Sequence, residues 1–329
     1  MKIAVLVTRM EKPSARYRIL QYLPYLEKEG YEAHVFVLQR GVLKRRVLFN
    51  RLADFDVVFL QKKLLSGLDF RYLRKKARRL IYDYDDAVMF RDPRRSRQEC
   101  RKRLRSFERT LKHVDWVIAG NAYLKGMAQG LTEKISVLPT PVPLESYQVK
   151  DYSIESQSVT LGWIGSTATV HYLNLISGDL KSLAEEYPHL RLKVVSDSFP
   201  SLQGIPVEEK RWCGDEEAAD LCSFDIGLMP LTDDPYSRGK CGFKILQYMA
   251  AGLPVVCSPV GMNREIIEDG VQGFWASSGA DWKKRLASLI EHPKKRQTMG
   301  LAGRKRVSET YALSVNAPKL AMLIRSLCL

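Results

Sequence analysis

Short apolar runs alternate along the chain with segments in which apolar residues recur at every third or fourth position. The segment ARYRILQYLPYLEKEG has this helical spacing and ends at Gly30. The apolar runs around it and after it lack polar alternation, as is typical of strands buried on both faces: KIAVLVT, AHVFVL, DVVFLQ, RLIYDYD and WVIAG. Strands of this kind interleaved with amphipathic helices predict a parallel sheet that helices cover on both sides.

The alternation pauses at VLPTPVPLESYQVKDYSIESQS and then begins again. Pro139, Pro141 and Pro143, followed by a polar stretch, indicate a linker at this point. Four further apolar runs follow it, again with helical segments between them: TLGWIG, RLKVVS, DIGLMPL and LPVVCS. The second series therefore predicts a second doubly wound sheet.

A length of 329 residues, about twice that of a typical domain, agrees with two domains. We expect an α/β fold with a first Rossmann-like domain at 1–143, a second at 144–310, and a C-terminal helix at 311–329 that crosses back to the first domain. In open parallel sheets, ligands bind beyond the carboxyl ends of the strands. Two such sheets facing one another would enclose a cleft suited to an enzyme with two substrates.

Composition excludes several classes of protein. With 45% hydrophobic and 27% charged residues, the chain is globular rather than disordered. No run approaches the roughly 18 apolar residues of a membrane span, and the N-terminus lacks a small-residue cleavage site. The six cysteines are dispersed, without CxxC spacing, which argues against a zinc site and a disulfide framework. We expect a soluble intracellular chain.

Positive charge is concentrated in the first half of the chain. Residues 1–150 hold 32 Lys and Arg against 16 Asp and Glu, whereas residues 151–329 hold 20 against 21. The basic residues are densest from Arg71 to Lys112. Such runs form either solvated helix faces or a surface that attracts a polyanion, such as anionic lipid, a phosphorylated acceptor or nucleic acid.

In the second half, two segments are candidates for binding phosphate. Gly165, Ser166 and Thr167 form a turn of small residues between a strand and a helical segment, where backbone N–H groups can face a phosphate. The same pattern also occurs in ordinary turns of this type. The turn therefore marks a candidate site only in combination with other residues.

The second candidate is the run PLTDDPYSRGKCGFKILQYMAAGLPVVCSPVG, which predicts a loop, a short helix closed by a glycine and a buried strand. Arg238, Lys240 and Lys244 cluster where the helix begins, beside Gly239 and Gly242. Cations, close backbone approach and the positive end of a helix together suit a departing diphosphate. The alternative is a solvated cationic loop.

Residues 225–273, from DIGLMPL through RGKCGFKILQYMAAGLPVVCSPVG to EIIEDGVQGF, resemble the donor-binding half of a family 4 (group 1) glycosyltransferase. TLGWIGS, TPVP, SARYRI and YDYDDA are also similar to bacterial members of this group, so the resemblance covers most of the chain. It implies the GT-B fold of two facing Rossmann-like domains. It also implies transfer of a sugar from a nucleotide-sugar donor, with retention of anomeric configuration and without a metal ion or cofactor.

The chain departs from the Glu-x7-Glu signature of that family, because Gly239 and Gln247 occupy the two glutamate positions. Gln247 can still hydrogen-bond a ribose hydroxyl, whereas Gly239 has no side chain for the donor sugar. The Arg and Lys that commonly follow the first strand of the donor domain are also missing, and Ser166, Thr167 and Thr169 stand there. We expect the cations at 238, 240 and 244 to contact the pyrophosphate, with Lys244 assisting its departure.

The first half supplies candidates for the acceptor side. Ser14 is a candidate helix N-cap, and Arg16 or Arg18 in the same segment could hold a phosphate. The alternative is the exposed start of a helix. Asn121 follows the strand WVIAG and is expected to face the cleft.

A cluster of carboxylates ends the strand RLIYDYD, at Asp83, Asp85 and Asp86. Asp86 is the candidate for an acceptor-binding or catalytic carboxylate, with Asp85 beside it on the acceptor side. A Mg²⁺ site and ion pairing with nearby arginines are the alternatives.

These observations favour a glycosyltransferase acting on a lipid-linked or polysaccharide acceptor of the cell envelope. The basic half is expected to hold it against anionic lipid, as a peripheral protein at the cytoplasmic face of the inner membrane. The alternative, suggested by the missing glutamates, is a protein of the same fold that binds nucleotide sugar without turnover. Nucleic-acid binding is disfavoured, because the basic stretches lack interleaved aromatic residues.

Overall fold

The computed structural model describes residues 1–154 and 157–328 and divides the chain into two compact units. The first unit comprises Met1–Pro141, Asp234–Cys241 and the C-terminal helix, and the second comprises Val142–Asp233 and Gly242–Ala312. The expected linker includes residues 155–156, which lie outside the described residues.

A six-stranded parallel sheet forms the centre of the first unit, in the order β2-β1-β3-β4-β5-β6. Its buried strands carry the near-continuous apolar runs that the sequence shows, since helices shield both faces. The strands are β1 (Lys2–Val7), β2 (Glu32–Val37), β3 (Val57–Gln61), β4 (Arg79–Tyr84), β5 (Trp116–Ala119) and β6 (Ile135–Val137).

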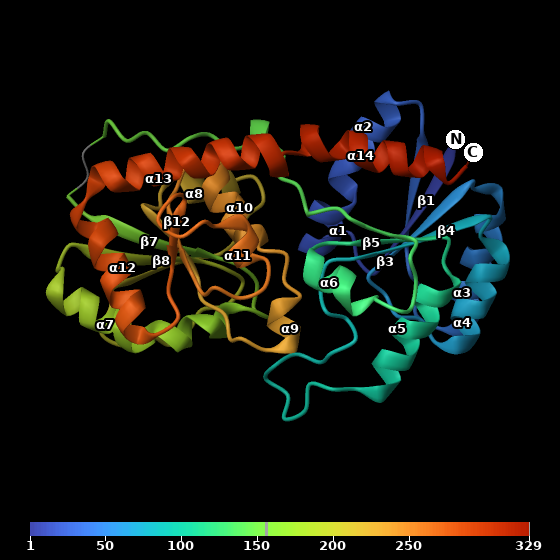
Figure 1. The fold of residues 1–329 in the computed structure, drawn as a ribbon, viewed down its shortest axis with the longest axis horizontal. Coiled ribbons are helices and arrows are strands. Elements are labelled where there is room, and N and C mark those ends of the chain that lie inside the picture. The colour runs from blue at the N-terminus through green and yellow to red at the C-terminus, as the bar shows by residue number, and fades with distance from the viewer. Residues whose placement is uncertain (155–156, 329) are drawn as a thin grey trace. The chain divides into compact units, whose positions relative to one another are not determined.

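Helices connect these strands and surround the sheet (Figure 1). They are α1 (Pro13–Arg18), α2 (Leu23–Lys28), α3 (Val42–Arg51), α4 (Gly67–Lys76), α5 (Arg101–His113) and α6 (Ala122–Met127), with short 3₁₀ turns at Leu20–Tyr22 and Leu52–Asp54. Two later segments of the chain add α9 (Pro235–Arg238) and α14 (Leu313–Ser326).

The C-terminal helix α14 is part of the core of the first unit. Ala317, Leu320, Ala321 and Ile324 are buried at three- and four-residue spacing, in one cluster with the apolar residues of β1. The carbonyl of Ala321 also accepts a hydrogen bond from the hydroxyl of Tyr31, at 3.2 Å. The helix thus stabilises a sheet formed some 300 positions earlier in the chain.

The second unit holds another six-stranded parallel sheet, in the order β12-β11-β10-β7-β8-β9. Its strands are β7 (Val159–Ile164), β8 (Leu190–Val195), β9 (Val207–Lys210), β10 (Ile226–Met229), β11 (Val255–Cys257) and β12 (Gly273–Trp275). Its helices are α7 (Ser177–Glu186), α8 (Glu217–Cys222), α10 (Phe243–Ala250), α11 (Asn263–Ile266), α12 (Gly279–Glu291) and α13 (Pro293–Arg306), with 3₁₀ turns at Leu144–Ser146 and Val170–Ile176 and a π-helical turn at Val307–Tyr311.

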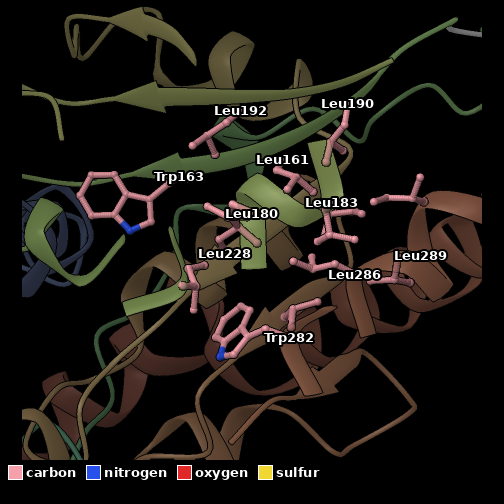
Figure 2. Packing of buried hydrophobic residues seen from close by; sticks show 14 of the residues in the cluster. Leu161, Trp163, Leu180, Leu183, Leu190, Leu192, Leu228, Trp282, Leu286 and Leu289 are labelled. Atoms are coloured by element: carbon pink, nitrogen blue, oxygen red, sulfur yellow. The ribbon is translucent and has the colours of Figure 1, made fainter. Parts of the chain in front are cut away.

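Leucines dominate the core between this sheet and the helices α7 and α12 (Figure 2). Leu161 and Leu192 project from β7 and β8, and leucines of the two helices pack against them. Trp163 and Trp282 fill the same cluster with 1% and 4% of their surfaces exposed. Burial of each such side chain contributes about 1.5–3 kcal/mol, so this interface is a main source of the unit's stability.

The predicted α/β class and both parallel, doubly wound sheets are confirmed. The apolar runs of the sequence correspond to nine of the strands, whereas β6, β9 and β12 were not predicted. These three are only three or four residues long, and each lies at an edge of its sheet. The strand β9 reads VEEK, because an edge strand needs no continuous apolar run.

In each sheet the strand order reverses at one point, and these points locate the candidate sites. In the first sheet the reversal lies between β1 and β3. In the second sheet it lies between β7 and β10, from which the chain adds strands in opposite directions. Helices at such a switch point leave opposite faces of the sheet, which opens a crevice at the carboxyl ends of the two strands. Among the described residues, no helix has the length and apolarity needed to span a bilayer.

Candidate functional site

Two segments predicted to bind the donor meet at the switch point of the second unit. The turn Gly165–Thr167 follows β7, and Lys244 lies in the first turn of α10, which follows β10. The Nζ atom of Lys244 lies 3.4 Å from the hydroxyl of Thr169 and 5.2 Å from the ring centre of Trp163. The structure therefore places a cation beside the small-residue turn.

Gly165 is required at this turn by the close approach of its neighbours. A Cβ atom there would lie 2.5 Å from the Cε atom of Lys244 and 2.5 Å from the ring of Trp163. The turn itself is tight, because the carbonyl of Ser166 accepts hydrogen bonds from the N–H groups of Thr169, at 2.8 Å, and Val170, at 3.2 Å. A residue larger than glycine would push Lys244 away from the turn.

The backbone before α10 also requires glycine. Gly242 precedes the helix with φ +62° and ψ 20°, in the left-handed region that other residues adopt only with strain. This conformation begins the helix directly after the loop and places Lys244 at the positive end of its dipole. The predicted helix, with Gly252 just beyond its C-terminus, is confirmed.

Gln247 lies in a buried hydrogen-bond network with only 4% of its surface exposed. Its side-chain amide donates to the hydroxyl of Tyr147 at 3.2 Å, and that hydroxyl donates to Glu217 at 3.0 Å. Trp212 donates to the other oxygen of Glu217 at 2.9 Å. Glu217, which no sequence motif marks, is the carboxylate of this network. The network holds Gln247 in place, and its contact with a ribose stays a prediction.

The three cations of the loop are divided between the units. Lys244 belongs to the second unit, whereas Arg238 and Lys240 belong to the segment Asp234–Cys241 of the first. Lys240 lies 5.0 Å from the ring centre of Tyr236, and Arg238 is exposed at the end of α9. Within either unit, the structure does not bring all three cations together.

Asn121 holds the segment Asp234–Cys241 to the first sheet. Its Nδ2 atom donates to the carbonyls of Gly239 and Lys240, at 3.2 Å each, and its Oδ1 atom caps α6 by accepting from the N–H of Leu124 at 2.8 Å. Both polar ends of the side chain are engaged and only 1% of the residue is exposed. The expectation that Asn121 faces an acceptor is therefore corrected: it is a helix cap and a backbone anchor.

Asn121→Ala is expected to lower the free energy of unfolding by about 2 kcal/mol, because it removes a helix cap and leaves the buried carbonyl of Gly239 and the partly buried carbonyl of Lys240 without their donor. Asn121→Ser keeps a capping oxygen but is too short to reach the carbonyls, so it should lose about half as much. Urea denaturation of the three proteins measures the effect. An alanine variant as stable as the parent would show that the anchor is not needed.

Gly239 occupies the position of the first missing glutamate because there is no room for a side chain. A Cβ atom at Gly239 would lie 2.6 Å from the Cβ atom of Ala87 and 2.8 Å from its backbone nitrogen. Its φ of −77° is open to any residue, so the constraint is steric. The segment also contacts the first sheet through Cys241, whose thiol donates to the carbonyl of Asp85 at 3.2 Å.

Arg18 and Asp83 form a buried ion pair in the first unit. The guanidinium Nε atom lies 2.9 and 3.1 Å from the two carboxylate oxygens, and Nη2 lies 2.9 Å from Oδ1. Nη1 donates to the carbonyl of Leu138. Only 2% of Arg18 and 3% of Asp83 are exposed, and burial raises the pKa of Asp83 to about 6 although Arg18 acts in the opposite direction.

This burial corrects the expectation that Arg18 holds an acceptor phosphate, because the guanidinium is paired with Asp83, its Nε and Nη1 atoms donate to Asp83 and to the backbone, and only 2% of the residue is exposed. Arg16 is less buried, and its guanidinium lies 5.1 Å from the ring centre of Tyr17. The helix α1 begins at Pro13, after Lys12, so the expected cap by Ser14 is wrong. Proline is favoured at the first helical position because its missing N–H has no partner there.

Lys62 is a central residue of the first switch point that the sequence analysis missed. It follows β3 directly, and among the described residues it is the non-glycine residue with a positive φ, at 60°. Its Nζ atom lies 3.2 Å from Oδ1 of Asp85 and also forms an ion pair with Asp86. Burial lowers the pKa of Lys62, but the two carboxylates more than compensate and raise it above its usual range. Residues held in this backbone region cluster at functional sites, and the conformation is visible only in the structure.

The side chains of Asp85 and Asp86 keep 13% and 22% of their surfaces exposed, beyond the carboxyl end of β4. Asp86 is thus accessible, paired with a cation and located at a switch point. No group of three His, Cys, Asp or Glu side chains suited to a metal ion occurs within residues 1–154 and 157–328.

Comparisons with known proteins identify related sequences and folds. Residues 234–306 match the family model described as glycosyl transferases group 1. A comparison with curated proteins found no match.

Several solved structures are similar over most of this chain. Sucrose-phosphate synthase from Thermosynechococcus elongatus is similar with a TM-score of 0.78 and 15% identity, over 99% of this chain and 98% of that one. HepE from Anabaena, in complex with UDP and glucose, is similar with a TM-score of 0.77 and 18% identity, over 99% and 100%. TarM from S. aureus, in complex with fondaparinux, alpha-GlcNAc-glycerol and UDP, gives 0.67 and 13%, over 85% and 58%. The predicted GT-B fold is confirmed.

Proposed function

We propose that the chain is a glycosyltransferase, since it has a match to the group 1 family model on a GT-B fold, and that it transfers a sugar from a nucleotide-sugar donor to a lipid-linked or polysaccharide acceptor. We further infer membership of the bacterial family 4 enzymes, with retention of configuration and without a metal ion. The observation that carries the proposal is the meeting of Lys244 with the Gly165 turn at the switch point of the second unit. HepE and TarM were solved with UDP, which supports a nucleoside-diphosphate leaving group here.

The donor diphosphate is proposed to lie against the turn Gly165, Ser166 and Thr167, with Lys244 as its cation. When the bond between the anomeric carbon and the diphosphate oxygen breaks, negative charge grows on that oxygen. A fixed ammonium group beside it lowers the energy of the transition state more than that of the bound donor. The predicted contacts of Arg238, Lys240 and Gln247 with the donor belong to this proposal.

The acceptor hydroxyl is proposed to donate its hydrogen bond to Asp86, with Asp85 and Arg16 on the same side. Lys62 fixes the position of Asp86 through their ion pair. An ionised carboxylate is a strong hydrogen-bond acceptor for a sugar hydroxyl and can assist removal of its proton.

The proposed localisation is supported by the charge distribution. A first half with 32 basic and 16 acidic residues is attracted to anionic lipid, whereas the second half is nearly neutral. We therefore propose a cytoplasmic protein that binds peripherally to the inner membrane face, in cell-envelope polysaccharide synthesis. No role with nucleic acid is proposed.

A second candidate is a protein that binds nucleotide sugar without turnover. The replacement of the glutamate pair favours this candidate. Gly239 is packed against Ala87, and Gln247 belongs to a buried hydrogen-bond network. Release of nucleoside diphosphate separates the two candidates.

A panel of nucleotide sugars tests the proposal. At a ligand concentration of about 100 times Kd, the true donor should stabilise the fold by about 2.7 kcal/mol, which thermal unfolding detects. The same donor with a lipid-linked acceptor should release nucleoside diphosphate continuously. Stabilisation without any release would favour the non-catalytic candidate, and stabilisation by no nucleotide sugar would contradict both.

A further inference from the structure

The helix α3 in the first unit exposes apolar side chains on the face that points away from the core. Leu43 and Val47, one helical turn apart, are 78% and 66% exposed, and Val42 is 48% exposed. Leu48 and Phe49 on the opposite face are buried. Solvation alone favours polar residues on an outer face, so large apolar side chains side by side there indicate a contact surface.

Cations flank these apolar residues. Lys44 and Arg46 lie on the two sides of the row formed by Leu43 and Val47, as the helical spacing of 3.6 residues per turn requires. Together α3 and α4 carry eight Lys and Arg against one acidic residue, Asp69. That carboxylate is buried and paired with Arg45 at 2.9 Å, so the exposed charge of the two helices is positive throughout.

The neighbouring helix α4 continues the same face. It packs beside α3 (Figure 1) and exposes 73% of Leu68. Tyr72 joins the two helices: its hydroxyl donates to Asn50 at 2.7 Å, and the guanidinium of Arg46 lies 5.3 Å from its ring centre. We define the α3–α4 face as Leu43, Val47 and Leu68 with Lys44, Arg46 and Arg71.

We propose that the α3–α4 face is the surface on which the protein lies on an anionic lipid bilayer. The three apolar side chains would enter the boundary between head groups and acyl chains, while the three cations contact lipid phosphates. An apolar row bordered by cations has the chemistry of such a boundary. A nucleic-acid backbone is bound mainly by Lys and Arg contacts to its phosphates, which would not explain the exposed aliphatic side chains of this face.

The inference deepens the proposed membrane localisation and rests on it. It assigns the contact to α3 and the start of α4, which lie mostly before the densest basic stretch, from Arg71 to Lys112. Charge alone would have favoured α5, with its Arg and Lys residues. The exposed apolar residues of α3 distinguish the two helices, because α5 exposes only Leu104, at 42%, among its large apolar side chains.

The test is sedimentation of the full chain with two kinds of vesicle: phosphatidylcholine alone, and phosphatidylcholine mixed with phosphatidylglycerol. The parent protein should pellet with the anionic vesicles only. The double variant Leu43→Asp/Val47→Asp should bind them about tenfold more weakly or worse, because it places two carboxylates where acyl chains should be. Lys44→Gln and Arg71→Gln should each weaken binding about fivefold.

Met322→Asp is the matched control, since Met322 is 69% exposed on α14 of the same unit. It should bind as the parent does, and all variants should keep the parent's thermal unfolding temperature and donor-induced stabilisation. Undiminished binding by Leu43→Asp/Val47→Asp would overturn the assignment to this face while leaving the peripheral localisation intact. A parent that ignores anionic vesicles would overturn lipid as the occupant, whatever the sugar-transfer assay shows.

Discussion

Lys244→Ala is expected to lower the rate of sugar transfer by about 10²–10³-fold, the loss typical of removing one group that stabilises developing negative charge. The structure holds this ammonium group within 3.4 Å of Thr169, beside a turn where glycine alone fits. The affinity for the nucleoside diphosphate should also fall, by about 1.5–3 kcal/mol, the range for a hydrogen bond to a charged group. Turnover and calorimetric binding measure the two effects separately.

Two further variants sharpen this prediction. Lys284 is an exposed lysine of α12 in the same unit, and Lys284→Ala should leave both transfer and binding unchanged. Lys244→Arg keeps the charge but changes its shape, so it should retain part of the affinity. If Lys244→Ala transfers sugar as fast as the parent, the diphosphate lies elsewhere and the proposed donor site is wrong.

Arg18→Met is expected to lower the free energy of unfolding by about 3–5 kcal/mol, since it leaves a buried carboxylate without its partner. Asp83 would then remain at 3% exposure among apolar neighbours of β4. This loss is a large part of the free energy of unfolding of a typical protein, which is about 5–15 kcal/mol. Denaturant unfolding at neutral pH measures it.

The loss of unfolding free energy caused by Arg18→Met should depend on pH. Burial raises the pKa of Asp83 to about 6 even with Arg18 present, and the arginine acts to lower it. Without Arg18 the folded-state pKa rises further, so the carboxyl becomes neutral in the variant at a higher pH than in the parent. A group whose pKa is raised on folding favours the folded state at low pH and loses that contribution as pH rises. The loss of stability caused by Arg18→Met should therefore be greatest above the raised pKa of Asp83 in the variant and shrink as the pH falls from there to about 6. Below pH 6 it should stay constant, because the carboxyl is then neutral in both folded proteins.

Two controls separate burial from charge. Arg78 pairs with Asp56 at 3.5 Å on the surface, with side chains 66% and 38% exposed, so Arg78→Met should cost less than about 1 kcal/mol. Arg18→Met/Asp83→Leu removes both partners and should recover much of the loss. A double variant less stable than Arg18→Met alone would contradict this account.

Features set by neighbouring residues were predictable from the sequence. The apolar runs predict nine strands, and the helix at Phe243–Ala250 follows from its periodicity and the glycines at its two ends. Residues 225–273 carried the resemblance to group 1 glycosyltransferases, because their residue types lie within one continuous stretch, and residues 234–306 match the family model. One local prediction was wrong: α1 begins at Pro13, so Ser14 is not its N-cap.

The partners of most candidate side chains could not be predicted in this way. Arg18 and Asp83 are 65 positions apart, and the sequence shows both only as polar residues near strand ends. Asn121 has a partner 118 positions away in Gly239, which converts an expected ligand into an anchor. No sequence motif marks Lys62. It stands out only through its left-handed backbone and its ion pairs with Asp85 and Asp86, which follow the neighbouring strand β4.

The sequence by itself determined the fold class, the two sheets, the charge asymmetry between the halves and the glycine-bounded helix of Lys244. These depend on hydrophobic periodicity, composition and backbone preferences, which act between residues close in the chain. Only the tertiary structure decided which polar groups are buried, which are paired and which remain accessible. Burial and pairing arise when distant strands align in register, and that alignment distinguishes Asp83, locked to an arginine, from Asp86, three residues later at the edge of the site.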